Sequence, residues 1–256
     1  MIIRRRFLAS VLAGVFLSSC APAGELSLND IIARNADARG GVETLNAVET
    51  TLNIATVTEP TFEVVGRYIA STGPNMRIDV FYDGDRVFSE GIDDDGEWQW
   101  LGGAPAATPS SEAAIESGAL RHGVIFNLYG LHALTKLGHK IELEGREPID
   151  GVSYYALKIT LDDGFETWRY VNPTNWKIDY SRDFRSFHPD VDPTRVWVQT
   201  KYDDFRVADG VFAPFRWTTT NLDTGEIIQT GEIHRLNYNI SAEELNFPRD
   251  AAVIAP

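Results

Sequence analysis

Apolar and polar residues alternate with a period of two along much of the chain. In the stretch NMRIDVFY (75–82), Met76, Ile78 and Val80 alternate with Arg77 and Asp79. The same alternation recurs in WKIDYS (176–181) and, less cleanly, in RVWVQTKY (195–202). A period of two places successive side chains on opposite faces of a β-strand. The pattern therefore predicts strands that are buried on one face and wet on the other.

Turn signals separate these alternating stretches at intervals of eight to fifteen residues. They combine Asp-Gly pairs and one Pro turn, and they occur in YDGD (82–85), DDDG (93–96), LDDG (161–164), VNPT (171–174), VADG (207–210) and LDTG (222–225). Asp-Gly between alternating strands is typical of tight antiparallel hairpins, whereas a parallel sheet needs long crossover segments. The spacing predicts eleven or twelve antiparallel strands.

Two regions depart from this pattern and predict helices. In SLNDIIARNADARGG (27–41), Ser27 is suited to cap a helix, with Asp30 as its capping-box partner, and Gly40 ends the helix. A second helical region is expected at about 111–137, after the small-residue loop GGAPAATPSS (102–111). The predicted layout is one helix, five strands, a helical insert and six or seven further strands. We therefore expect a single domain over 27–256, mainly β with α, in which the helices cover one face of a meandering antiparallel sheet.

The N-terminus has the plan of an export signal. Arg4, Arg5 and Arg6 precede thirteen uncharged residues that end in small side chains. This run is too short to cross a bilayer, which takes about 20 apolar residues. We interpret residues 1–19 as a signal peptide and residues 20–26 as a tether. The stretch RRRFL (4–8) also fits the twin-arginine pattern, so either export route is possible.

The only cysteine of the chain, Cys20, follows this run directly, and LSSC (17–20) resembles the bacterial lipobox. That resemblance implies a lipid anchor on Cys20 that holds the protein on a membrane and facing the periplasm. A stable anchor needs two or more acyl chains. In bacterial lipoproteins an Asp after the cysteine retains the protein at the inner membrane. Ala21 occupies that position here, which favours the outer membrane.

Charge and motifs narrow the function further. The formal charge is −14, and it becomes −17 when the signal peptide with its three arginines is cleaved off. This charge opposes binding to nucleic acid, which needs a basic surface. His188, Asp190 and Asp192 in FHPDVDP could gather around a cation, but such loops need more oxygen ligands, so we interpret them as a surface loop. We find no nucleotide-binding glycine loop and no GxSxG elbow, and we predict no enzyme activity, no metal and no cofactor.

Four segments together resemble the LolA/LolB family of periplasmic lipoprotein carriers. They are ARGGVETLNAVETT (38–51), DGVSYYALKITLDDGFETWRYVNPTNWKID (150–179), KYDDFRVADGVFAPFRW (201–217) and NYNISAEELNFP (237–248). The resemblance implies a half-open antiparallel β-barrel of about eleven strands, wrapped around helices, with an apolar concave face that takes up acyl chains. The implied partner is a lipid or an acylated lipoprotein, and the identity of any protein partner is unknown.

Eleven side chains are expected on that concave face. They are Met76, Ile78, Val80, Trp98, Trp100, Trp176, Ile178, Val196, Val198, Phe215 and Trp217. The same side chains could instead simply pack against the helices as the core of the barrel. The sequence also has no apolar loop like that of the outer-membrane acceptor of this family. A second hypothesis is therefore an envelope lipoprotein that serves as an interaction scaffold for a transport or signalling complex, without lipid cargo.

Overall fold

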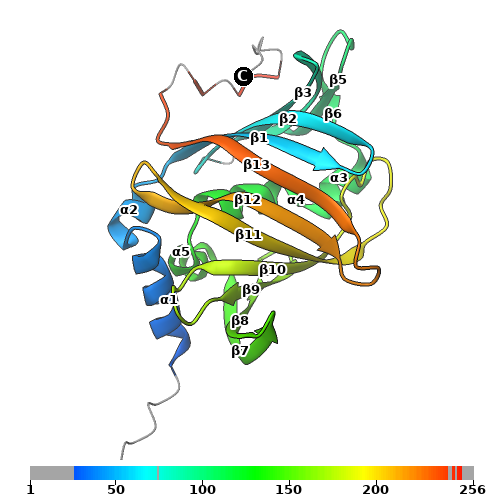
Figure 1. Ribbon diagram of the computed structural model, residues 1–256. Helices are drawn as coiled ribbons and strands as arrows, with labels where there is room; N and C mark the ends of the chain where they lie inside the picture. Colours follow the sequence, from blue (N-terminus) through cyan, green and yellow to red (C-terminus); the bar gives the residue numbers. More distant parts are fainter. Residues whose placement is uncertain (1–25, 74, 242–243, 246, 250–256) are drawn as a thin grey trace, which may run out of the picture.

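The computed structural model describes residues 26–73, 75–241, 244–245 and 247–249, and these residues are mainly β-strand (Figure 1). The strands are β1 (Thr50–Glu59), β2 (Phe62–Ser71), β3 (Met76–Tyr82), β4 (Asp85–Asp93), β5 (Gly96–Leu101), β6 (Thr108–Pro109), β7 (Lys140–Ile149), β8 (Val152–Thr160), β9 (Glu166–Val171), β10 (Ile178–Arg185), β11 (Val196–Ala208), β12 (Val211–Asn221) and β13 (Ile227–Tyr238). The helices are α1 (Leu28–Ala38), α2 (Val42–Asn46), α3 (Glu112–Ser117), α4 (Ala119–Leu128), α5 (Leu131–Leu134) and the 3₁₀ turn η1 (Thr135–Leu137).

All these strands form one antiparallel sheet of 13 strands, in the order β6-β5-β4-β3-β2-β1-β13-β12-β11-β10-β9-β8-β7. The first and last strands of the chain pair at its centre, with Thr51 opposite Tyr238. Two arms extend from this pair, one formed by β2–β6 and the other by β7–β12. The end strands β6 and β7 do not pair with each other, so the sheet curves but does not close. This confirms the predicted half-open antiparallel architecture, with thirteen strands instead of about eleven.

The hairpin turns follow from their Asp-Gly pairs. Asp83 and Gly84 have φ of 51° and 85°, and Asp209 and Gly210 have φ of 46° and 87°. Two consecutive residues with positive φ give the turn whose twist matches that of antiparallel strands. These pairs join β3 to β4 and β11 to β12, as the sequence predicts.

The first helix begins at the predicted cap and docks on the second arm. The Ser27 Oγ accepts a hydrogen bond from the Asp30 amide at 3.2 Å, and the Ser27 amide donates to Asp30 Oδ2 at 3.1 Å. At the other end Gly40 has a φ of +119°, and a Cβ there would lie 2.3 Å from the carbonyl oxygen of Gly210. Glycine is thus required where the turn after α1 meets the β11–β12 hairpin.

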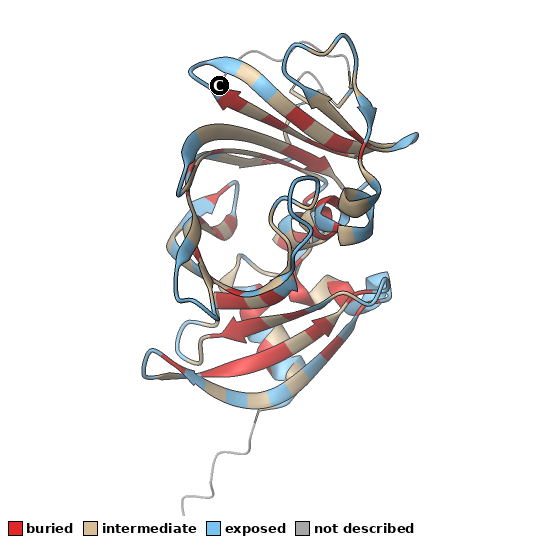
Figure 2. Ribbon diagram, turned by 90° about the vertical axis from the view of Figure 1, so that its right-hand side faces the viewer, coloured by how far each residue is buried: buried red, intermediate tan, exposed pale blue. Residues whose placement is uncertain are grey.

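The helices fill the concave side of the sheet in two places (Figure 2). The segment from α3 to η1 lies within the predicted insert and leads from β6 at one edge to β7 at the other. One cluster packs Leu45 of α2 and Val124 of α4 against β1–β4, β12 and β13. A second packs Ile31 of α1 and Leu134 of α5 against β7–β9. The first cluster therefore joins β12 to the first arm, whereas the second lies on the outer strands of the second arm.

The prediction that one face of β3 is exposed to solvent is wrong. Arg77 and Asp79 of β3, expected in water, are both 0% exposed. They lie on the outer face of the sheet, where the segment after β13 covers them: Arg77 donates to the Pro248 carbonyl, and the neighbouring Arg67 donates to the Glu244 carbonyl at 2.8 Å. The alternation of β3 identified a strand, but a charged pair that neutralises itself can occupy a buried face.

A candidate ligand-binding cavity

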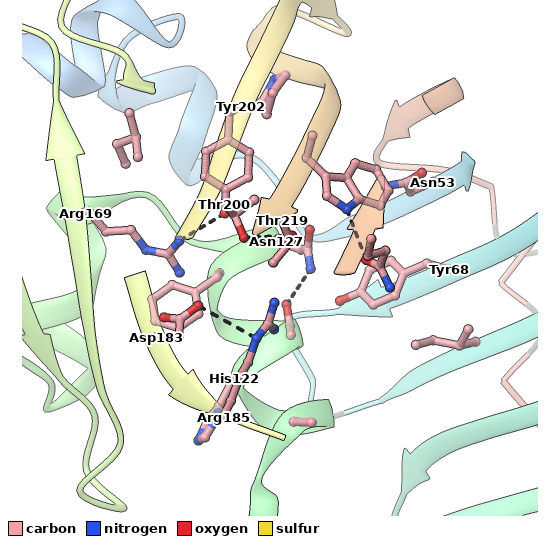
Figure 3. A pocket seen from close by; sticks show the side chains of 18 of the residues that line it. Asn53, Tyr68, His122, Asn127, Arg169, Asp183, Arg185, Thr200, Tyr202 and Thr219 are labelled. Carbon is pink, nitrogen blue, oxygen red and sulfur yellow. Dashed lines mark hydrogen bonds and ion pairs between the residues drawn. The ribbon is translucent and has the colours of Figure 1, made fainter. Parts of the chain in front are cut away.

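A cavity of about 910 Å³ lies between the two arms, on the concave side of the sheet (Figure 3). Its walls come from β1, β2 and β3 on one side, from β9 to β13 on the other, and from α3, α4 and residues 186–195. A volume of this size is at the upper end of what small-molecule sites have, roughly 300–1,000 Å³. It is therefore large enough for a lipid-sized ligand.

Part of the lining is apolar. It includes Ala55 of β1, Ile78 of β3, Phe126 of α4, Trp217 of β12 and Ile233 of β13. These residues share the concave face because paired strands place opposite residues on one side of a sheet, as Ala55 and Ile233 are paired. The polar edge of the Trp217 indole is bonded, since its Nε1 donates to Gln229 Oε1 at 3.1 Å. This part of the wall offers surface to hydrocarbon.

The wall formed by β9 to β12 carries a polar band. Arg169 of β9 is 8% exposed, and its Nη1 donates to the hydroxyl of Tyr202 on β11 at 3.1 Å. The Tyr202 hydroxyl also lies 3.1 Å from Ser181 Oγ on β10. Next to Tyr202 in this band, the hydroxyls of Thr200 on β11 and Thr219 on β12 are 3.0 Å apart. Figure 3 shows Arg169, Tyr202, Thr200 and Thr219 on one side of the cavity.

Several polar atoms of the lining have no hydrogen-bond partner within the described part of the chain. They are Asn53 Oδ1, Asp183 Oδ1 and Arg185 Nε, all buried. Burial also raises the pKa of Tyr68, so its hydroxyl stays protonated. Most buried polar atoms in proteins are bonded to protein or water. These buried atoms therefore have unused hydrogen-bonding capacity.

A histidine–aspartate pair lies at the side of α4. His122 Nε2 is 2.8 Å from Asp163 Oδ2, and its ring stacks on Phe165 with centroids 4.1 Å apart. Burial holds the pKa of His122 below its usual range, although Asp163 opposes this shift. Among the described residues, the pair has no serine or cysteine hydrogen-bonded to His122. We interpret it as a contact that fixes α4 against the β8–β9 turn.

The loop residues considered for a cation are engaged elsewhere. His188 Nε2 lies 3.0 Å from Glu59 Oε2, and Asp190 accepts from Ser111. Asp192 accepts from the Thr194 amide at 2.9 Å. The described part of the chain contains no group of three or more His, Cys, Asp or Glu side chains placed to hold a metal ion.

The structure brings only some of the eleven predicted residues to the cavity. Ile78, Ile178 and Trp217 line it. Met76, Val80, Val196, Val198 and Phe215 share the concave face with lining residues by strand register, but they do not line the cavity. Met76 and Phe215 belong to the core cluster around α2 and α4. Trp176 precedes β10 and stacks on Tyr155, with centroids 5.9 Å apart.

Trp98 and Trp100 lie on the opposite face, so their predicted inward orientation is wrong. Trp98 is opposite Gly91, which is opposite Arg77, so all three share the outer face. Trp98 is 0% exposed with the Arg77 guanidinium 5.7 Å from its ring centroid, and Arg86 lies 4.1 Å from that of Trp100. Tryptophans pack well beneath arginines, so hydrophobicity alone does not tell the concave face from this covered outer face.

The polar lining residues are absent from the sequence prediction. Thr167, Arg169 and Val171 alternate with Glu166, Trp168 and Tyr170 in ETWRYV, which gives both faces of β9 a mixed character. The large aromatic side chains of this strand lie on the outer face, where Tyr170 packs with Tyr154 and Tyr180. Arg169 lies in a strand interior, but so do Arg67 and Arg77, so the sequence contains no signal that singles it out. Cys20 and residues 1–19 lie outside the described residues, so the anchor and the signal peptide stay predictions.

No family model matches the sequence, and no curated protein matches it. Solved structures do match. A LolA superfamily protein from Nitrosomonas europaea superposes with a TM-score of 0.57 at 14% identity, covering 88% of this chain and 99% of that one. A DUF1329 family protein from Desulfovibrio piger gives 0.56 at 11%, covering 86% and 96%. A domain described as an outer membrane lipoprotein-sorting protein from Vibrio parahaemolyticus gives 0.54 at 10%, covering 85% and 95%. The chain therefore has the LolA-like fold that the sequence resemblance implies.

The described residues contain no helix long and apolar enough to cross a membrane.

Proposed function

We propose that this protein is a non-catalytic envelope lipoprotein that binds a lipid or a lipoprotein acyl group in the cavity between its two arms. The observation that carries the proposal is the cavity itself, a space of about 910 Å³ on the concave side of a LolA-like sheet. Apolar ligands gain about 25 cal/mol for each Å² of surface removed from water. The apolar wall around Ile78, Phe126 and Trp217 offers such a surface without directed bonds.

A substitution that fills the cavity tests this function. Gly66 lines the cavity, and a Cβ there would meet only the Ala55 carbonyl oxygen, at 3.9 Å. Gly66→Leu therefore adds a branched side chain at the cavity wall, and its Cβ meets no close neighbour. We expect the full-length protein, purified gently from its native membrane, to carry a lipid-sized ligand in native mass spectrometry, and the variant to lose it.

Gly73→Leu is the matched control. Gly73 is exposed in the turn between β2 and β3, and a Cβ there meets Ser71 Oγ at 3.6 Å and Asn75 Nδ2 at 3.9 Å, which are ordinary contacts. This variant should keep the ligand. Equal ligand occupancy in wild type and folded Gly66→Leu protein would place the binding site elsewhere, and an empty wild-type protein would remove the basis of the proposal.

We further propose that Cys20 carries the lipid that attaches the protein to the envelope membrane, facing the periplasm and more specifically at the outer membrane. The support is the sequence LSSC after a basic and apolar segment. Because the chain has no other cysteine, any thioether-linked lipid must be on this residue. Labelled palmitate should enter the wild-type protein and not Cys20→Ala. Label that persists in the variant would contradict the anchor.

A second candidate function is an interaction scaffold, and one feature favours it. On the outer face of the second arm, Trp197 and Phe184 are each 38% exposed, and Trp197 packs against Phe184 and Trp168 with ring centroids 5.4 and 5.6 Å apart. Exposed aromatic side chains are enriched at protein interfaces. Crosslinking that recovers a reproducible protein partner, lost in Trp197→Ser, together with no co-purified lipid, would favour this function over the carrier.

A further inference from the structure

The charges around the cavity reverse the balance of the whole chain. The chain has 37 acidic and 23 basic residues. The cavity lining has five basic side chains, Arg39, Arg169, Lys177, Arg185 and Arg195, against the three carboxylates of Glu116, Asp163 and Asp183. A pocket for bare hydrocarbon needs no charge at all, because burying charges costs free energy unless they are paired. The lining is therefore suited to a ligand that also has a polar, anionic part.

Arg169 is the cation best placed to receive it. Its side chain is 8% exposed, and its Cζ lies 4.2 Å from the centroid of the Phe126 ring. Its one hydrogen bond to a side chain is donated to the neutral hydroxyl of Tyr202. Among the described residues it forms no ion pair with a carboxylate. A guanidinium has five donors in a planar fork that fits carboxylate or phosphate oxygens, so most of its capacity remains for a ligand.

Asp183 adds an acceptor close to this cation. Asp183 is opposite Thr167, and Arg169 is opposite Ser181, so the two side chains are diagonal neighbours on the concave face of β9 and β10. Such neighbours are roughly 7–8 Å apart. The Oδ1 of Asp183 has no partner, and its Oδ2 is 4.0 Å from Arg185 Nε, which is a loose contact. A donor group on the same ligand can therefore meet Asp183 while an anion meets Arg169.

We propose that the cavity selects an amphiphile whose anionic head group, a phosphate or a carboxylate, pairs with Arg169, and whose neighbouring hydroxyl or ammonium donates to Asp183. The alkyl chain then extends along the wall of Ile78, Phe126 and Trp217. This inference rests on the proposed function, because it names the class of lipid that the same cavity takes. It distinguishes such a lipid from a diacylglyceryl group that has no charge.

Two probes with the same chain test the anion contact. Dodecanoyl-lysophosphatidate and monododecanoylglycerol share their acyl chain and glycerol and differ only by the phosphate. Both are titrated, below micelle formation, against the whole protein carrying an apolar fluorescent reporter. We expect the phosphate to strengthen binding by about tenfold or more, as one charge-assisted contact does. Inorganic phosphate alone should not displace the reporter, whereas displacement by it would show a free-anion site and overturn the selection of an amphiphile.

Arg169→Gln should abolish the preference for the phosphate while it leaves the affinity for monododecanoylglycerol unchanged. Arg169→Lys should keep part of the preference, since it keeps the charge. The matched control is Arg216→Gln, because Arg216 has a 54% exposed side chain that lies 3.7 Å from Asp203, and it should bind like the wild type. If Arg169→Gln fails to fold, the proposal is judged by whether the wild type binds dodecanoyl-lysophosphatidate more tightly than monododecanoylglycerol. Equal wild-type affinity for both probes overturns this inference and leaves the carrier function standing, whereas no binding of either probe overturns both.

The contact between a ligand donor and Asp183 is tested with a third probe. Dodecanoyl-lysophosphatidylethanolamine presents an ammonium beside its phosphate, and we expect its affinity relative to the phosphate monoester to fall by several-fold in Asp183→Asn, since a charge-assisted bond is replaced by a neutral one. An unchanged ratio in the folded variant would refute the role of Asp183 and confine the selection to Arg169.

Discussion

Asp79 is the carboxylate on which the outer face of the first arm depends, and its removal should destabilise the whole domain. It is 0% exposed, and it accepts from Arg77 Nε at 2.9 and 3.0 Å and from Ser89 Oγ at 2.7 Å. The guanidinium groups of Arg67 and Arg86 also lie 3.6 Å from it. Asp79→Ala takes one anion away from a buried cluster with three cations.

The expected magnitude follows from the exposure of those cations. The side chains of Arg67 and Arg86 are 12% and 18% exposed, so they can reach water when the carboxylate is gone, but the side chain of Arg77 is 0% exposed. Breaking one buried ion pair costs about 3–5 kcal/mol. We expect a loss of this size in the free energy of unfolding. For a domain of this length that corresponds to a melting temperature lower by roughly 10 °C.

Urea unfolding followed by tryptophan fluorescence measures this change, because Trp98 packs beneath Arg77. The control is Asp94→Ala in the exposed β4–β5 turn, which should change stability by less than about 0.5 kcal/mol. Unchanged unfolding slopes would show that the variants unfold to similar states. If Asp79→Ala is within about 1 kcal/mol of the control, the buried cluster does not stabilise the fold and the argument is wrong.

Two further predictions concern the concave side. Burial, and next the negative charge of Asp190, raise the pKa of Glu90 from 4.5 to about 7, so the folded state keeps this proton at a pH where the unfolded state has lost it. The free energy of unfolding should therefore fall by up to about 3 kcal/mol from pH 4.5 to 7. Urea midpoints measured across this range should fall less steeply in Glu90→Gln than in the wild type. An equal fall of the urea midpoint with pH in the wild type and in Glu90→Gln would contradict this prediction. In Gly231→Ala the new Cβ would lie 2.0 Å from the Trp217 ring, so we expect a shifted near-ultraviolet circular dichroism signal and a loss of about 1–3 kcal/mol. Gly66→Ala, whose Cβ meets nothing closer than 3.9 Å, is the control and should behave like the wild type.

The sequence was sufficient to predict the elements because their signals are local. The Ser27 cap, the Asp-Gly turns and the period of two each depend on a few neighbouring residues, and each is present in the structure. The face on which a side chain lies depends on partners far along the chain. Trp98 lies outward because Gly91 and Arg77 occupy its row, and Arg77 is covered by a segment more than 160 residues later.

Register explains another difference. The sequence WKIDYS places Trp176, Ile178 and Tyr180 on one face, but the pairing of β9 with β10 shifts between Ile178 and Tyr180. Ile178 therefore faces the cavity, while Tyr180 packs outside with Tyr154. A bulge of this kind adds one residue to one strand and reverses every later side chain. Nothing in the six residues themselves indicates it.

The strands beside the cavity bury their apolar side chains in two separate clusters. Strands β1–β4, β12 and β13 pack on α2 and α4, strands β7–β9 pack on α5 and on Ile31 of α1, and Tyr129 contacts both clusters. Closing the space would press Ile78 against the polar band around Arg169 and would desolvate the polar side chains of that band. That desolvation would cost about 1–3 kcal/mol for each such group. The polar band therefore opposes closure of the cavity, and under the proposed function it would favour a ligand whose polar groups match it.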